Sequence, residues 1–109
     1  KVWQRAVKLS TELYIKFRSL NDFGFKDQVT RSGLSVPSNI AEGMSRQSVK
    51  DKVKFLIIAK SSYAELRTQL YIGIEVGYVD NNIGREWISE TREIASMLSG
   101  LIRTLTRGQ

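Results

Sequence analysis

Three side chains capable of chemistry lie close together in the sequence SVPSNIAEG, residues 35–43: Ser38, Asn39 and Glu42. In a hydrolytic site the serine would act as the nucleophile and the glutamate as an acid or base. Serine is a weak nucleophile until a neighbouring base takes its proton, and the chain contains no histidine for that role. No motif places a lysine there instead. We therefore assign no catalytic residue and expect the protein not to be an enzyme.

The same nine residues contain the only proline of the chain, Pro37. A proline within a helix cannot donate to the carbonyl group four residues earlier, here that of Gly33, and its ring crowds that carbonyl. Buried backbone groups need hydrogen-bond partners. Ser38 and Asn39 could donate hydrogen bonds to the freed carbonyl, and Glu42 could accept a hydrogen bond from a neighbouring helix or subunit. The main alternative to this structural role is that the three polar residues contact a ligand or partner. The structural polar motif that we predict consists of Ser38, Asn39, Glu42 and Gly43.

Clustered carboxylates could also hold a metal ion, and Glu86, Glu90 and Glu93 share one face of a predicted helix. The chain has no cysteine and no histidine, so disulfides and the usual zinc sites are excluded. The Glu-x-x-His arrangement of di-iron bundles is absent for the same reason. We expect a solvated acidic face, with no metal site and no cofactor.

Positive charge is concentrated in the first half of the chain. The net charge is +6; residues 1–54 hold 11 basic and 5 acidic side chains, whereas residues 55–109 hold 6 of each. Such asymmetry suggests a surface for a polyanion, although a solvated face chosen for solubility is the alternative. No zinc-finger or RNP signature is present, so any nucleic acid would be recognised by backbone and shape. The candidate nucleic-acid or partner-binding residues are Lys1, Arg5, Lys8, Lys16, Arg31, Arg46, Lys50, Lys52 and Lys54.

Apolar residues recur at spacings of three and four along four segments, which predicts four helices. The connections between the segments are short, so successive helices should run antiparallel. The predicted fold is an all-α, up-down-up-down four-helix bundle, one domain spanning residues 1–109. We expect the second helix to be a single helix that is kinked at Pro37 and ends with Gly43 as its C-cap. The alternative is two short helices. The predicted helices cover about 1–20, 25–43, 49–78 and 83–106.

The third predicted helix is apolar on more than one side, with Leu56 and Ile57 on one and Ile58 on another. A helix of this kind is buried on more than one face, and in so short a chain the second partner is expected to be another copy. Ser48 followed by Asp51 predicts the start of this helix, because their spacing is that of a capping box. No apolar run reaches the length of a membrane span and no signal peptide is recognised, so we expect a cytoplasmic protein without membrane contact.

Several stretches of the chain resemble a known family, the small four-helix-bundle proteins encoded in bacterial 23S rRNA intervening sequences. The resemblance covers nearly the whole chain and is most specific in the nine residues of the polar motif. One departure occurs at Ser61-Ser62, where the family often has Gly-Ser, and it bears on how closely two helices approach. The matching stretches include VWQRA at 2–6, SVPSNIAEG at 35–43, ELRTQL at 65–70 and MLSGLI at 97–102.

The resemblance implies a four-helix bundle that assembles into a ring-like homo-oligomer, taken as a pentamer. A related bundle is the accessory protein of diversity-generating retroelements, where it partners a reverse transcriptase. Two functions follow as hypotheses. The first is a non-enzymatic oligomer that binds nucleic acid through its basic surface. Structured RNA is the expected ligand, and DNA is the other nucleic acid considered. The second is a protein adaptor that docks an acidic or nucleic-acid-processing enzyme such as a reverse transcriptase.

Overall fold

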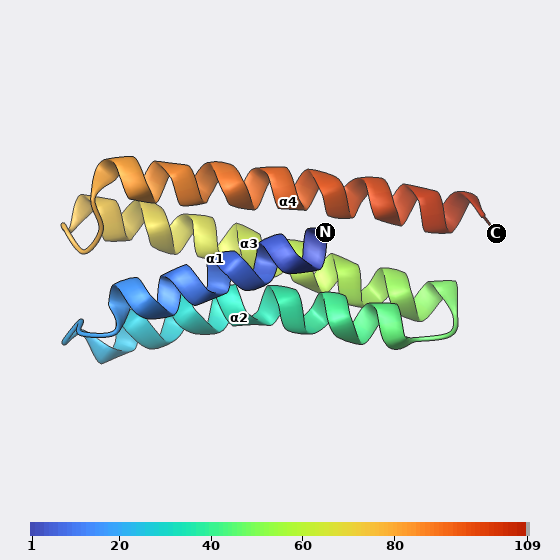
Figure 1. Ribbon diagram of the computed structural model, residues 1–109, viewed down its shortest axis with the longest axis horizontal. Coiled ribbons are helices and arrows are strands. Elements are labelled where there is room, and N and C mark those ends of the chain that lie inside the picture. The colour runs from blue at the N-terminus through green and yellow to red at the C-terminus, as the bar shows by residue number, and fades with distance from the viewer. Residues whose placement is uncertain (109) are drawn as a thin grey trace.

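The computed structural model describes residues 1–108, which form four helices joined by short turns (Figure 1). Successive helices run in opposite directions, and no strand occurs within these residues. The predicted all-α four-helix bundle is confirmed. The helices are α1 (Val2–Phe17), α2 (Phe23–Ser45), α3 (Val49–Glu75) and α4 (Asn81–Arg107).

The core is built from the apolar stripes that the sequence pattern indicates. On α2, Val29, Val36 and Ile40 are buried, as the spacing of three and four requires. Gly33 lies on the same stripe, and its missing side chain leaves room for Leu13 of α1 to lie against the α2 backbone. The stripes of all four helices meet in one cluster, whose burial supplies the main stabilisation at about 25 cal/mol per Å² of apolar surface.

Helix α2 begins two residues earlier than predicted. The carboxylate of Asp22 accepts a hydrogen bond from the backbone N–H of Phe25 at 3.0 Å, so Asp22 is the N-cap and Phe23 is already helical. Residues 23 and 24, which the sequence analysis left between the first two predicted helices, therefore belong to α2. At α3 the prediction is confirmed, because the hydroxyl group of Ser48 accepts from the N–H of Asp51 at 3.1 Å.

Helix α2 continues through Pro37 as a single helix, so the alternative of two short helices is wrong. The prediction that Gly43 ends it is also wrong, because the helix extends to Ser45 and Gly43 is a buried helical residue. A Cβ atom on Gly43 would lie 3.0 Å from the Cβ of Phe55 and 3.2 Å from the carbonyl oxygen of Lys52. The glycine is thus explained by the close approach of α2 to α3, and not by a turn.

The four helices differ in length, and this shapes the bundle. Helix α1 has 16 residues whereas α4 has 27, so the C-terminal part of α4 extends beyond α1 in a molecule 47 Å long (Figure 1). Three apolar residues in that part are only half-buried: Leu101, Ile102 and Leu105. No helix within residues 1–108 combines the length and apolar character that a membrane-spanning segment requires.

Candidate functional site

The predicted polar motif connects α2 with α3, but through different residues from those expected. The side-chain amide of Asn39 donates to the carbonyl oxygen of Ser35 at 2.8 Å and to its hydroxyl oxygen at 2.9 Å. That hydroxyl lies 2.9 Å from the hydroxyl of buried Ser62 on α3. Asn39 therefore bonds the carbonyl of Ser35 and not that of Gly33. Ser62 matches the serine of the Gly-Ser pattern, so the departure from that pattern falls on Ser61.

The other two polar residues of the motif do not join this connection. Ser38 is exposed and lines a groove between α1 and α2. The carboxylate of Glu42 pairs at 2.6 Å with Arg46, one turn later on its own helix. Within this chain the ion-pair partner of Glu42 is thus Arg46 and not a residue of a neighbouring helix. Acceptance from a neighbouring subunit stays a prediction.

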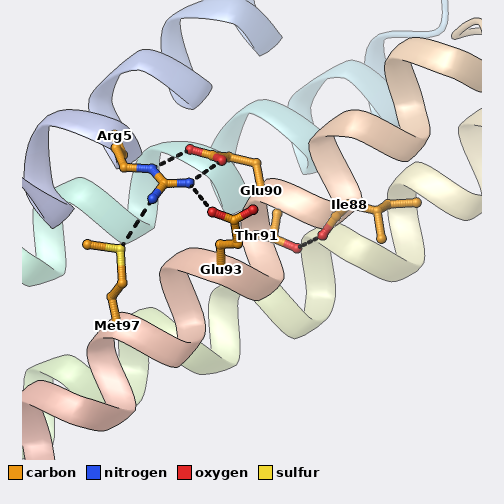
Figure 2. Close-up of polar contacts among 6 residues, drawn as sticks. All are labelled: Arg5, Ile88, Glu90, Thr91, Glu93 and Met97. Carbon is orange, nitrogen blue, oxygen red and sulfur yellow. Dashed lines mark hydrogen bonds and ion pairs between the residues drawn. The ribbon is translucent and has the colours of Figure 1, made fainter.

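A network of charged side chains joins α1 to α4 (Figure 2). The guanidinium group of Arg5 donates to both carboxylate oxygens of Glu90, at 2.9 and 2.5 Å, and to Glu93 at 2.7 Å. It also contacts the sulfur of Met97 at 3.5 Å. These hydrogen bonds hold the pKa of Glu90 below its ordinary value and raise that of Arg5. The prediction of a solvated acidic face is wrong for Glu90, whose side chain is 31% exposed beneath Arg5, whereas Glu93 also bonds Arg5 but remains 62% exposed.

The network lies in a cleft of about 340 Å³ between the two helices. Lys8 and Glu12 from α1 and Glu86 from α4 complete its charged lining. Glu12 accepts a hydrogen bond from the indole N–H of Trp87 at 2.9 Å. The basic stripe of α1 thus faces the acidic stripe of α4, and each neutralises part of the other. Arg5 could bind a phosphate group only by giving up these partners.

The remaining predicted basic residues fall into separate places. Lys1, the N-cap of α1, and Lys8 lie beside Arg5, and Lys16 is exposed at the other end of that helix. Arg31 pairs with Asp27 at 2.8 Å within α2. Four of the nine lie between the end of α2 and the first two turns of α3. We name them the end cluster: Arg46, Lys50, Lys52 and Lys54.

The end cluster is held in place by contacts with apolar and backbone groups. The guanidinium group of Arg46 lies 4.8 Å from the ring centroid of Phe55, and the ammonium group of Lys54 lies 6.0 Å from it. The Lys52 ammonium donates to the carbonyl oxygen of Met44 at 3.3 Å. Lys50 and Lys54 are exposed, one helical turn apart. This end of the bundle therefore presents exposed cations beside cations that contact apolar or backbone groups.

A second group of cations was missed by the sequence analysis. Arg85 and Arg92 of α4 contact Tyr71 of α3, and Arg67, one turn earlier on α3, bonds Thr91 of α4. Residues 55–109 contain equal numbers of acidic and basic residues, so their net charge gave no sign of this group. A count of charges does not show on which side of a helix each charge lies. The signal that could have found them is the spacing of seven between Arg85 and Arg92, which places both on a stripe different from that of Glu86, Glu90 and Glu93.

Comparison with known proteins agrees with this fold. A family model described as 23S rRNA-intervening sequence protein matches residues 1–100. A crystal structure from Bacteroides thetaiotaomicron, a protein with unknown function from the S23 ribosomal protein family, superposes with a TM-score of 0.87. The two sequences are 24% identical over 94% of this chain and 98% of that chain, a level at which the likeness shows a shared fold. The comparison with curated proteins finds no match.

Proposed function

The chain belongs to the family of 23S rRNA-intervening sequence proteins, and from this membership we propose a non-enzymatic bundle that assembles with its own copies and binds nucleic acid, structured RNA above all. The end cluster carries the proposal. It consists of Arg46, which pairs with Glu42, and of Lys50, Lys52 and Lys54 in the first two turns of α3, where the acidic residue is Asp51. Cations gathered in this way attract a phosphate backbone and release its counterions, without reading base sequence.

Assembly is supported by apolar side chains that α3 leaves exposed. Ile57 and Ile72 of α3 are each 50% exposed, and Val76, the C-cap of α3, is 56% exposed, while another side of the helix is buried in the core. Burying such residues against a sister chain would remove apolar surface from water. A closed ring, which we take as a pentamer, would bring several end clusters onto one particle. Several weak sites on one particle bind a long polyanion far more tightly than one site.

Filter binding of structured RNA at rising salt tests the proposal. We expect binding that weakens steeply with salt, because each neutralised phosphate contributes a slope of about −0.7 to −0.9 in log K against log salt. Lys50→Gln with Lys54→Gln should make the slope shallower. Arg18→Gln with Arg107→Gln is the matched control, because it removes the same charge from exposed sites outside the end cluster. Absence of binding by the native protein at low salt would refute RNA binding.

Native mass measurement tests assembly separately. The protein should have a mass that is a multiple of the single chain, and total cellular RNA should add mass to that particle. A stable single chain at micromolar concentration would contradict self-assembly. Ile57→Lys with Ile72→Lys should shift the mass toward the single chain, because charges at an apolar contact lose their hydration.

A second candidate function is a protein adaptor that docks a nucleic-acid-processing enzyme such as a reverse transcriptase. It is favoured by the groove between α1 and α2, about 430 Å³ in volume and lined by exposed Trp3, Tyr14 and Leu34. Aromatic residues of this kind are enriched where proteins meet. Purification from the native host after nuclease treatment tests it. An enzyme retained without nucleic acid supports the adaptor, whereas its loss on nuclease treatment supports RNA binding alone.

A further inference from the structure

The charges of α4 are separated onto two sides of the helix. Glu86, Glu90 and Glu93 line the cleft toward α1, where Arg5 pairs with the last two. Arg85 and Arg92 lie on another stripe, since seven residues are nearly two full turns. Within residues 1–108 neither of these arginines forms an ion pair. The pairing of α1 with the glutamates therefore leaves an uncompensated positive side on α4.

These arginines meet a third across the seam between α3 and α4. The guanidinium group of Arg92 donates to the hydroxyl oxygen of Tyr71 at 3.3 Å, and that of Arg85 lies 5.6 Å from the ring centroid. Arg67 precedes Tyr71 by one turn of α3 and donates to the hydroxyl of Thr91 at 3.3 Å. Arg85 and Arg92 thus contact one tyrosine, and the positive charge of Arg67 lies near enough to it to influence its pKa. The mutual repulsion of these cations would be relieved by an anion bound among them.

Tyr71 is suited to complete such a site. Its hydroxyl oxygen accepts from Arg92, so its own proton remains available to an incoming acceptor. The hydrogen bond from Arg92 and the surrounding positive charges lower the pKa of Tyr71, which makes the hydroxyl a better donor. The side chain is 37% exposed, so a ligand can reach it from solvent.

We propose that the arginine–tyrosine cluster, Arg67, Tyr71, Arg85 and Arg92, binds phosphate groups of a nucleic-acid strand. The inference rests on nucleic acid being the ligand of the protein, but it assigns a surface outside the basic first half. Guanidinium groups hold phosphate oxygens in pairs, which a lysine cannot do. The cluster by itself would suit a single anion, and its length along the helices favours a polymeric ligand with many phosphate groups.

The extent of the cluster favours a phosphate backbone over an acidic protein. Arg85 and Arg92 are separated by about 10.5 Å along the helix axis, at 1.5 Å per residue. Lys60 lies seven residues before Arg67, which continues the row along the same stripe of α3. One strand presents a phosphate at every nucleotide, so a row of cations can meet successive groups. Carboxylates on a folded protein have no such repeat.

Equilibrium binding of a short oligouridine by three proteins tests the inference. The cluster variant carries Arg85→Gln and Arg92→Gln, and the control carries Arg18→Gln and Arg107→Gln, so both lose two positive charges. We expect the cluster variant to bind about 25-fold more weakly at 0.1 M salt, with a salt slope shallower by about 1.4, because each contact with a single strand contributes about 0.7. The control should change affinity by about 2-fold through net charge alone.

A second variant, Tyr71→Phe, removes the donor without changing charge or bulk. It should weaken oligouridine binding roughly 5-fold while leaving the salt slope unchanged, as loss of one hydrogen bond predicts. This variant decides the question even if the double substitution disturbs folding.

Other results would overturn the inference in distinguishable ways. If the cluster variant and Tyr71→Phe bind as tightly as the control, the cluster is not the site, while the proposed function stands through the end cluster. If the cluster variant loses binding of polyglutamate and keeps that of oligouridine, the ligand is an acidic protein. If the native protein binds no oligouridine or structured RNA at low salt, both the inference and the proposed function fail.

Discussion

Replacing Gly43 with alanine should destabilise the bundle, although alanine is the better helix former. Inside a helix this exchange gains about 1 kcal/mol from the lower entropy of the unfolded chain. At Gly43 the new methyl group would meet the Cβ of Phe55 at 3.0 Å and the carbonyl oxygen of Lys52 at 3.2 Å. The second of these belongs to the α3 backbone, so relief requires that two helices move apart. Overpacking of this kind costs about 1–3 kcal/mol, which leaves a net loss of about 1 kcal/mol.

Gly100 offers a matched control on the same chain. It lies within α4, and a Cβ atom there would meet only the flexible end of Arg103, at an ordinary 3.7 Å. Gly100→Ala should therefore gain about 1 kcal/mol of unfolding free energy. The two variants should differ by about 2 kcal/mol, which corresponds to roughly 10 °C in melting temperature for a domain near 100 residues.

Circular dichroism during heating and urea unfolding measures the difference. All proteins should be compared at one chain concentration, because the stability of an oligomer depends on concentration. The dependence of unfolding free energy on urea should stay unchanged, since the surface exposed on unfolding is the same. If Gly43→Ala proved as stable as the native protein or more stable, the close α2–α3 approach would not be what requires glycine at this position.

Three further changes test other contacts. Asn39→Leu should lower the melting temperature or alter the oligomer mass, because it removes both hydrogen bonds to Ser35; no change in either would argue against a structural role. Glu90→Gln should weaken the pH dependence of unfolding: Arg5 lowers the folded pKa of Glu90 below 4.5, so the pair stabilises above that pH and is lost as pH falls through the folded value. An acid unfolding curve identical to that of the native protein would contradict this. Tyr63→Phe should raise the unfolding free energy by about 1 kcal/mol, because the buried hydroxyl has no hydrogen-bond partner within residues 1–108; destabilisation would reveal one.

The helices and their buried sides were predictable because their signals are local. A spacing of three and four places residues such as Val29, Val36 and Ile40 on one side of a helix whatever surrounds it. The cap at Ser48 was equally local, since the N–H that it accepts belongs to Asp51. The start of α2 was missed by two residues because the apolar stripe begins at Phe25, whereas the helix begins directly after its N-cap, Asp22.

The candidate sites were less predictable, because they depend on partners distant in sequence. Ser35 drew no attention as a lone serine, yet it bonds Ser62, 27 residues away. In the sequence Gly43 resembles a residue that ends a helix. Its role in the close packing of α2 against α3 can be seen only in the tertiary structure. In both cases the deciding distance is set by how two helices pack.

By itself the sequence determined four amphipathic helices, an excess of positive charge, and a chemistry without histidine or cysteine, because these follow from residue types and their period. Only the tertiary structure decided which charged side chains are neutralised by ion pairs within the chain. It brings Arg5 to Glu90, 85 residues away, and leaves Arg85 and Arg92 around Tyr71. The physical reason is that electrostatic energy depends on separation in space, which helix packing sets and a count of charges along a chain does not contain.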